Sequence, residues 1–450
     1  MLEKTIELIS EKKYNELKAM LSELQAADVA DLLDELEHKK VLLVFRLLPK
    51  ELAAEVFVHL KNDSQEMLIK NFSDSELKTV FSDLYMDDIV DIIEEMPASI
   101  VKRILAHTDS ATRSTINQLL QYGDESAGSI MTTELISLRK DMTVTQAFDK
   151  IRKTGVDSET IYTCYVIEDD RKLIGALSVR TLLLADPDDI IDGIMEHNVI
   201  SVKTTDDREF VANQMKKYDF VAMPVVDAEN RLVGIVTIDD AFDVMEDETE
   251  EDFAIMAGIQ PSDSEDTYLE TPVFIHAKNR IMWLMFLMLS ATVTGLIITG
   301  YQDKLLAIPI LTSFIPMLMD TGGNCGSQSS TVVIRGLALD ELKFKDLFKV
   351  MFKEFKISLI VGFILALINT ARIYLMYRKT LPNALAISSA VGVTLMITVL
   401  VSKLVGCILP MLASKMKLDP AIMATPLITT IVDACSILIF FNVATMMLHI

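Results

Sequence analysis

The sequence predicts a multidomain membrane protein with three parts: an all-α superhelical N-terminal domain, an α/β pair of repeated domains and a five-helix transmembrane domain. Three observations lead to this prediction. Residues 1–125 show helical periodicity without a strand pattern, residues 126–252 contain an internal repeat, and long uncharged runs occur only after residue 270. The expected boundaries are 1–125, 126–252 with copies at 126–190 and 191–245, an acidic connecting helix and linker at 241–275, and 276–450.

The charge of the chain is divided unevenly between its two parts. Residues 271–450 carry 15 Lys and Arg against 8 Asp and Glu, whereas residues 1–270 carry 27 against 57. Such acidity argues against nucleic acid as a partner and favours cations. The four cysteines have no CxxC spacing, so neither a disulfide framework nor a zinc site is expected.

In the N-terminal domain, apolar residues recur at i, i+3, i+4 and i+7, which predicts a series of short amphipathic helices. Residues 31–48 resemble residues 91–108 at an offset of 60, which predicts stacked helical hairpins in a small superhelix. Generic helices with a coincidental similarity are the alternative. The chain opens with a charged amphipathic helix and not with a signal peptide, so we expect this part in the cytoplasm.

The repeat is clearest in two pairs of segments. Residues 131–151 match residues 195–215 at an offset of 64, and residues 165–179 match residues 224–238 at an offset of 59. Each copy predicts a short strand, an amphipathic helix, two strands joined by a polar turn, and a second helix.

An acidic run follows the second copy. Nine of the fourteen residues from Asp239 to Asp252 are acidic and none is basic. A solvated acidic face is the ordinary explanation of such a run. Carboxylates this dense repel one another along a helix, however, and divalent cations bound through carboxylate oxygens or water would relieve that repulsion.

The last part of the chain predicts five membrane spans. The uncharged run 281–300 is long enough to cross a bilayer. Further spans are expected at about 305–334, 357–377, 381–412 and 421–450. Lysine and arginine clusters precede the first and fifth spans and fill the loop between the second and third. The positive-inside rule then places the N-terminal domains in the cytoplasm and the C-terminus outside.

One carboxylate, Asp433, interrupts the fifth span. A charge at the centre of a membrane helix costs about 2.5–3.5 kcal/mol on insertion scales, which predicts a functional role. The alternative is an ion pair, for which Lys403 in the fourth span is the nearest candidate. Pro426 lies upstream in the same span and is expected to free a backbone carbonyl towards a lumen.

The second span offers a polar face. Asp320, Asn324 and Gln328 recur at intervals of four, so one side of a helix would present all three. Asp320 is expected to be functional because it is a charge within a span. For Asn324 and Gln328, pore lining and small-residue helix packing remain equal alternatives.

These features together resemble one known family. The repeat is similar to a tandem cystathionine-β-synthase (CBS) domain pair. The whole chain resembles the MgtE magnesium channels and transporters, with specific motifs in TGGNCGSQSSTVVIRGLA (321–338) and LDPAIMATPLITTIVD (418–433). One departure is Ser436, where the family often has Gly; it puts the local helix packing or carbonyl exposure in doubt.

The resemblance implies a homodimer in the cell membrane, with a pore between the subunits where Asp433 binds Mg²⁺. It also implies that cytosolic Mg²⁺ binds several carboxylates and closes the pore. The positions that match this sensor pattern are Glu55, Asp87, Asp91, Asp207, Glu209, Asp219, Asp240, Asp243, Glu248, Glu251, Asp252 and Asp419.

The CBS resemblance further implies a nucleotide site, with ATP as the expected ligand. The second copy has the family's hydroxyl and carboxylate in Thr237 and Asp240, and Phe220 would stack on the adenine. The first copy has Ser178 and Thr181 instead, so only one adenosine site looks intact. Because many CBS pairs bind no nucleotide, ATP binding stays open.

The expected function is magnesium transport into the cytoplasm, gated closed by cytosolic Mg²⁺. The alternatives are another divalent cation, such as Co²⁺ or Mn²⁺, and an anion. An anion path needs helix N-termini or basic residues at mid-membrane, and the fifth span offers only an acid. An enzyme is not expected, because the sequence has no P-loop, nucleophile constellation or metal-protease motif.

Overall fold

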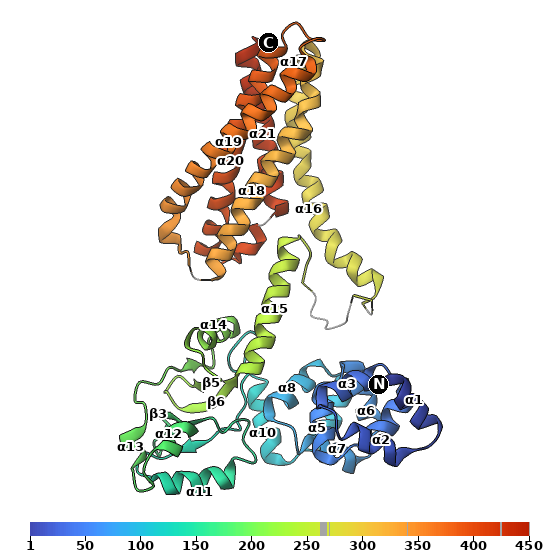
Figure 1. Ribbon diagram of the computed structural model, residues 1–450, viewed down its shortest axis with the longest axis vertical. Coiled ribbons are helices and arrows are strands. Elements are labelled where there is room, and N and C mark those ends of the chain that lie inside the picture. The colour runs from blue at the N-terminus through green and yellow to red at the C-terminus, as the bar shows by residue number, and fades with distance from the viewer. Residues whose placement is uncertain (262–267, 270, 340, 424, 450) are drawn as a thin grey trace. The chain divides into compact units, whose positions relative to one another are not determined.

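The structure, a computed structural model, describes every residue except 262–267, 270, 340, 424 and 450. Parts of the predicted linker and of the fifth span therefore lie outside the described residues. Two compact units are present, residues 1–246 and 247–450, and each is described by itself. Helical repeats, two small mixed sheets and long apolar helices occur in the predicted order, which confirms the predicted fold class (Figure 1).

The N-terminal region consists of short helices that stack in order. Helix α3 packs on α5, α5 on α7 and α7 on α9, while α4 packs on α6. Alternate helices thus form a layer of the kind expected for stacked hairpins. The bounds are α1 Leu2–Ser10, α2 Tyr14–Leu21, α3 Ala26–Asp34, α4 His38–Phe45, α5 Lys50–Val58, α6 Asn62–Asn71, α7 Asp74–Phe81, α8 Met86–Glu95, α9 Ala98–His107 and α10 Ser110–Leu119.

The two repeated copies have the same topology. In each, a short first strand pairs parallel to the second, and the second pairs antiparallel to the third with a register shift near its end. The first copy contains β1 Ser137–Leu138, α11 Val144–Thr154, β2 Thr163–Ile167, β3 Leu173–Ser178 and α12 Val179–Leu184. The second contains β4 Val202–Lys203, α14 Arg208–Tyr218, β5 Ala222–Val226 and β6 Leu232–Thr237, and α13 Ile191–Ile194 joins the copies.

A reciprocal backbone contact joins the copies. The Leu173 amide donates to the Asn230 carbonyl and the Leu232 amide donates to the Arg171 carbonyl, each at 3.0 Å. Arg171 and Asn230 are equivalent at the offset of 59, and both have positive φ. The sequence repeat therefore corresponds to a pseudo-twofold arrangement of two sheets.

The acidic run forms helix α15, Ile238–Met256, and the membrane helices follow. Four helical segments are long and apolar enough to cross a membrane: Val273–Gly300, Phe344–Tyr377, Ala384–Lys415 and Pro420–Leu448. They contain α16 Val273–Gly300, η2 Phe344–Asp346, α19 Leu347–Tyr377, α20 Ala384–Lys415, η3 Pro420–Met423 and α21 Thr425–Leu448.

The predicted second span differs from the helix in that region. Its first residues form α17 Gln302–Ala307 and a 3₁₀ segment, η1 Pro309–Phe314, and the long helix α18 runs only from Ile315 to Ala338. Helix α18 falls short of the apolarity of the other four because glycines and polar residues fill its middle.

Close packing around α18 explains its glycines. Helix α18 packs on both α20 and α21. A Cβ on Gly323 would lie 2.9 Å from the Thr429 side chain, and one on Gly326 would lie 2.7 Å from Ile428. Such distances would force α18 and α21 apart, so the small residues set the helix separation.

Candidate functional site

A polar stripe lies on the side of α18 that the other helices leave uncovered. Asp320, Asn324 and Gln328 are all exposed, whereas Gly322, Gly326 and Ser329 are buried between helices. The two alternatives for this stretch therefore apply to different faces of one helix. The glycine face packs, and the polar face is available to water, to ions or to a second copy of the chain.

Asp433 of α21 lies beside this stripe. Its side chain is half-buried, and its charge interacts with that of Asp320. Among the described residues, neither carboxylate has an ion-pair partner within 4.0 Å. The stripe and Asp433 together bring two acids and two amides to one surface of the membrane unit.

Lys403 does not pair with Asp433. It lies 3.7 Å from a carboxylate oxygen of Glu354 on α19, and both side chains are nearly inaccessible to solvent. The Ser329 hydroxyl donates to the same Glu354 oxygen at 2.7 Å and lies 3.2 Å from the Lys403 amine. The ion-pair alternative for Asp433 is therefore wrong for Lys403, which belongs to a separate buried triad.

Two local features of α21 bear on the sequence predictions. Pro426 lies in the first turn of the helix, where a missing backbone N–H costs no intrahelical bond, and the freed carbonyl stays a prediction. The carbonyl of Pro426 itself accepts bonds from the Thr429 and Thr430 hydroxyls at 2.9 and 3.0 Å. Ser436 packs over Gly322, and its hydroxyl donates to the Val432 carbonyl at 2.7 Å.

A second group of carboxylates gathers within unit 1–246. It joins α8 of the N-terminal region to the two repeated copies. Burial raises the pKa of Asp87 well above its usual value, and the nearby Asp240 raises it further. Burial followed by Asp240 and Asp88 raises the pKa of Asp91 to about 8. The members of this α8 acidic cluster are Asp87, Asp88, Asp91, Glu134, Glu159, Asp239 and Asp240.

Glu159 was not anticipated from the sequence. It follows α11 in the first copy, and burial together with Asp88 and Asp239 raises its pKa to about 8. Its Oε2 atom is buried and has no hydrogen-bond partner in the described structure. No local pattern marks it, because its acidic neighbours come from α8 and α15.

Four other predicted sensor residues lie on α5 and at the two ends of α14. Glu55 is exposed on α5. Asp207 caps the start of α14 and accepts a bond from the Phe210 amide, Glu209 lies in its first turn, and Asp219 ends the helix with φ of 55°. About 18 Å separates the two ends of a helix this long, so Asp219 cannot share an ion with Asp207 and Glu209.

The end of α15 lies against the membrane helices within unit 247–450. Burial raises the pKa of Asp252, and Asp419 and Glu251 raise it further. Gly258 ends the helix with φ of +71°, and a Cβ there would collide with the Trp283 ring. Asp243, Glu248 and Glu251 lie on the same helix.

The described residues contain no group of three or more His, Cys, Asp or Glu side chains arranged to hold a metal ion. Mg²⁺ binds through few direct ligands and keeps several waters, so paired carboxylates suffice for weak sites.

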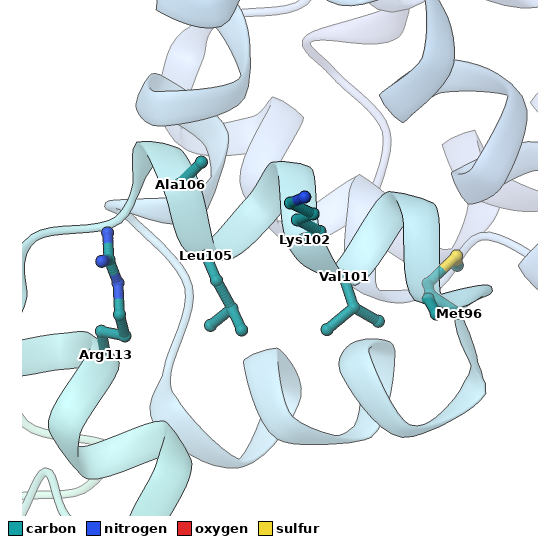
Figure 2. Close-up of a pocket in the computed structure, with 7 residues that line it drawn as sticks. Met96, Val101, Lys102, Leu105, Ala106 and Arg113 are labelled. Carbon is teal, nitrogen blue, oxygen red and sulfur yellow. The ribbon is translucent and has the colours of Figure 1, made fainter.

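A cavity of about 600 Å³ on the N-terminal region is lined by apolar and basic side chains. Figure 2 shows Val101 and Leu105 on the same side of α9, with two basic residues nearby. Its lining is Met96, Ala98, Val101, Lys102, Leu105, Ala106 and Arg113, without an acid.

The nucleotide candidates form a compact group in the second copy. The Thr237 hydroxyl donates to Asp240 at 2.6 Å, and the Thr237 amide lies 3.3 Å from the same oxygen. Phe220 is half-buried and stacks on Tyr218 at 5.6 Å between ring centroids. The first copy also has a cavity, of about 530 Å³, beside Ser178, Arg180 and Thr181.

The α8 acidic cluster leads to a prediction about pH. A carboxyl whose pKa is higher in the folded than in the unfolded state loses stability as pH rises between the two values. Without divalent cations, the melting temperature of the full chain should therefore fall between about pH 5 and pH 8. Asp91→Asn should reduce this fall by about 2–4 °C.

The control for this measurement is Asp31→Asn, which removes an exposed acid from α3 of the same region. Circular dichroism of the full chain in detergent provides the melting curves. Equal pH profiles for wild type and Asp91→Asn would contradict the raised pKa of Asp91.

Comparison with known proteins gives consistent matches over the whole chain. Residues 315–443 match the MgtE divalent cation transporter family, residues 24–125 the MgtE intracellular N domain, and residues 127–188 and 190–247 the CBS domain. The chain is 35% identical over 447 residues to the magnesium transporter MgtE of Thermus thermophilus, covering 98% of this chain and 97% of the relative. It is 30% identical over 442 residues to the magnesium transporter MgtE of Bacillus subtilis, covering 98% and 96%.

A solved structure is similar to the soluble part. It is the cytosolic domain of the Mg²⁺ channel MgtE in complex with ATP, at 37% identity and a TM-score of 0.52. The match covers 54% of this chain and all of that one.

Proposed function

Because the chain belongs to the MgtE family of magnesium transporters, we propose that it conducts Mg²⁺ through a pore at the axis of a homodimer. The observation that carries this proposal is the exposed stripe of Asp320, Asn324 and Gln328 beside Asp433. Polar groups at this depth in a membrane need water or protein against them and not lipid. A second copy placed against the stripe would enclose a polar path.

The chemistry of the stripe suits a hydrated divalent cation. Two Asp433 side chains at one level of a dimer would offer two negative charges to an ion that keeps most of its waters. Amide oxygens of Asn324 and Gln328 would accept hydrogen bonds from that water shell. Mg²⁺ uptake into liposomes under an imposed gradient tests this path, with Co²⁺, Mn²⁺ and chloride as the competing substrates.

The orientation proposed for the chain follows from its basic clusters. Lys278, Arg280 and the lysines between α18 and α19 favour a cytoplasmic position for unit 1–246. The C-terminus then lies outside the cell. The acidic domains would consequently meet the cytosolic Mg²⁺ that has already entered.

Cytosolic Mg²⁺ is the proposed regulator of the pore. In the α8 acidic cluster and between Asp252 and Asp419, carboxylates from different elements approach one another. Such approaches are unfavourable until a cation bridges them, so bound Mg²⁺ favours the packed arrangement. Several weak sites are needed for a steep response, because each ion shifts the equilibrium only by its preference for the closed state.

A triple substitution tests this gating. Asp243→Ala, Glu248→Ala and Glu251→Ala together should remove Mg²⁺-dependent protection of residues 241–275 from protease. The same variant should alter the closure of the pore by internal Mg²⁺ in patch recordings. The variant Glu3→Ala, Glu7→Ala and Glu16→Ala removes the same charge from exposed positions on α1 and α2 and is the control. If the triple variant keeps its Mg²⁺-dependent protection from protease and its pore still closes normally with internal Mg²⁺, the acidic residues of α15 are only solvated and do not bind a regulatory ion.

ATP is the proposed second ligand, bound in the second CBS copy. The cytosolic domain to which this chain is similar was solved with ATP. Here Thr237 and Asp240 form the matching hydroxyl–carboxylate pair, and Phe220 offers a ring to the base. Calorimetry should show at least about tenfold weaker ATP binding in Asp240→Ala, since a hydrogen bond to a charged group is worth about 1.5–3 kcal/mol.

The competing location for ATP is the cavity beside Ser178 and Thr181 in the first copy. Arg180→Ala is therefore the matched variant. Loss of ATP binding in Arg180→Ala, together with unchanged binding in Asp240→Ala, would move the nucleotide to the first copy.

A further inference from the structure

Helix α19 is longer than a membrane span requires. It has 31 residues, of which the run 357–377, apolar apart from Arg372 near its end, is alone long enough to cross the hydrocarbon core. Residues 347–356 are thus an extension of about 15 Å beyond that run. Their sequence, LFKVMFKEFK, mixes phenylalanine and lysine.

The extension has three distinct faces. At 100° per residue, Phe348, Phe352 and Phe355 fall within an arc of about 60°. Lys349, Lys353 and Lys356 fall within a neighbouring arc of about the same width, and Glu354 lies about 130° from both. The buried Glu354 faces the helix bundle through its contact with Ser329.

Both outer faces are accessible in the membrane unit. Phe348 is 80% exposed, Phe352 59% and Phe355 37%. The three lysines are exposed beside them, and the Lys356 amine lies 4.3 Å from the centre of the Phe352 ring. Lys415 of α20 adds a further cation to this end, 4.4 Å from the centre of the Phe344 ring.

We propose that this aromatic–basic surface, residues 345–356, binds anionic phospholipids. The lysines match the phosphate of a lipid headgroup, and the phenylalanines match the glycerol and upper acyl region next to it. The surface continues directly into an apolar run of membrane length, so its aromatic face lies where lipid is the neighbour. A soluble anion would use the lysines but leave three large aromatic side chains in water.

The charge balance along the surface supports the same ligand. Apart from the buried Glu354, Asp346 is the only acid within residues 345–356, and it pairs with Lys349 at 2.8 Å. Lys345, Lys353 and Lys356 supply further positive charge within twelve residues. A negative headgroup therefore meets a net positive surface, whereas a zwitterionic headgroup gains little from it.

Lipid binding to the full chain tests this proposal. The protein in neutral detergent is titrated with phosphatidylglycerol or phosphatidylcholine, and bound lipids are counted by native mass spectrometry. Lys353→Gln with Lys356→Gln should weaken phosphatidylglycerol binding roughly tenfold, since each charge near a membrane surface contributes a several-fold effect. Phosphatidylcholine binding should change less than about twofold, because its headgroup carries no net charge.

The opposite end of the same helix provides the matched control. Arg378→Gln with Lys379→Gln removes the same charge just after α19 ends, and both side chains are exposed. Phe348→Ser with Phe352→Ser should also weaken phosphatidylglycerol binding. If the surface bound the phosphate through charge alone, these two changes would leave binding unaltered. Elution profiles identify variants that fail to fold, and the single variant Lys353→Gln then replaces the pair.

Three results would overturn the proposal. Equal losses in the Lys353/Lys356 and Arg378/Lys379 pairs would show a general charge effect. Displacement of phosphatidylglycerol by millimolar inorganic phosphate would show a soluble-anion site. Undiminished phosphatidylglycerol binding in the Lys353→Gln, Lys356→Gln variant would show that these lysines do not bind lipid headgroups and instead balance the chain's own carboxylates.

Discussion

Asp433→Asn should reduce Mg²⁺ uptake to about one-tenth of the wild-type rate or less, because it removes the only charge on α21 from the proposed path. The change is isosteric, and the half-buried carboxylate has no ion-pair partner among the described residues whose loss would unfold the helix. Folding should therefore be retained. Uptake into liposomes loaded with a Mg²⁺ indicator measures the effect, and size-exclusion chromatography measures folding.

The matched control for Asp433→Asn is Asp303→Asn. Asp303 is an exposed acid on α17, outside the polar stripe of α18, so its neutralisation removes the same charge from the membrane unit. Its uptake should remain within about twofold of wild type if only charges near the ion matter. Wild-type flux through well-folded Asp433→Asn would contradict the pore assignment and leave Asp320 as the alternative ion site.

The periodic features of the structure were predictable from the sequence. The offset of 59 between Arg171 and Asn230 corresponds to the reciprocal backbone bonds between the two copies. The spacing of four between Asp320, Asn324 and Gln328 gave their common exposed face on α18. Both are consequences of local geometry, since a repeat and a helical period are written along the chain.

Features that depend on contacts between distant segments were not predictable in this way. Lys403 and Glu354 are 49 residues apart, and nothing in either segment specifies that they meet. The one available signal was Glu354 itself, the single acid among the lysines of residues 347–356. Glu159 gave no signal at all, because its neighbours Asp88 and Asp239 belong to other domains.

Boundaries were the other source of error, and their cause is physical. The predicted second span began ten residues too early because the apolar residues that start at Leu305, in the second half of α17, continue through η1 into α18. Pro309 and Pro316 interrupt the helix there, since proline lacks the amide that a continuous helix needs. Apolarity alone does not distinguish a straight helix from a broken one.

The buried triad of Ser329, Glu354 and Lys403 carries the second large expected effect. Lys403→Met should destabilise the full chain by about 3–5 kcal/mol, because it leaves the Glu354 carboxylate buried without its cation. Glu354→Leu should have a similar effect by leaving the lysine alone. The double variant Lys403→Met with Glu354→Leu should recover most of the loss, because two apolar side chains need no partner.

An ion pair at the start of the same helix, whose lysine is exposed to solvent, provides the control. Lys349 and Asp346 lie 2.8 Å apart with the Lys349 side chain 84% exposed, so breaking their contact should cost less than about 1 kcal/mol. Heating in detergent followed by size-exclusion chromatography compares the surviving fractions of the variants. If the double variant is as unstable as either single one, desolvation of an unpaired charge is not the cause. The triad would then act through the Ser329 hydroxyl, which both Lys403 and Glu354 contact on α18, next to Gln328 of the polar stripe.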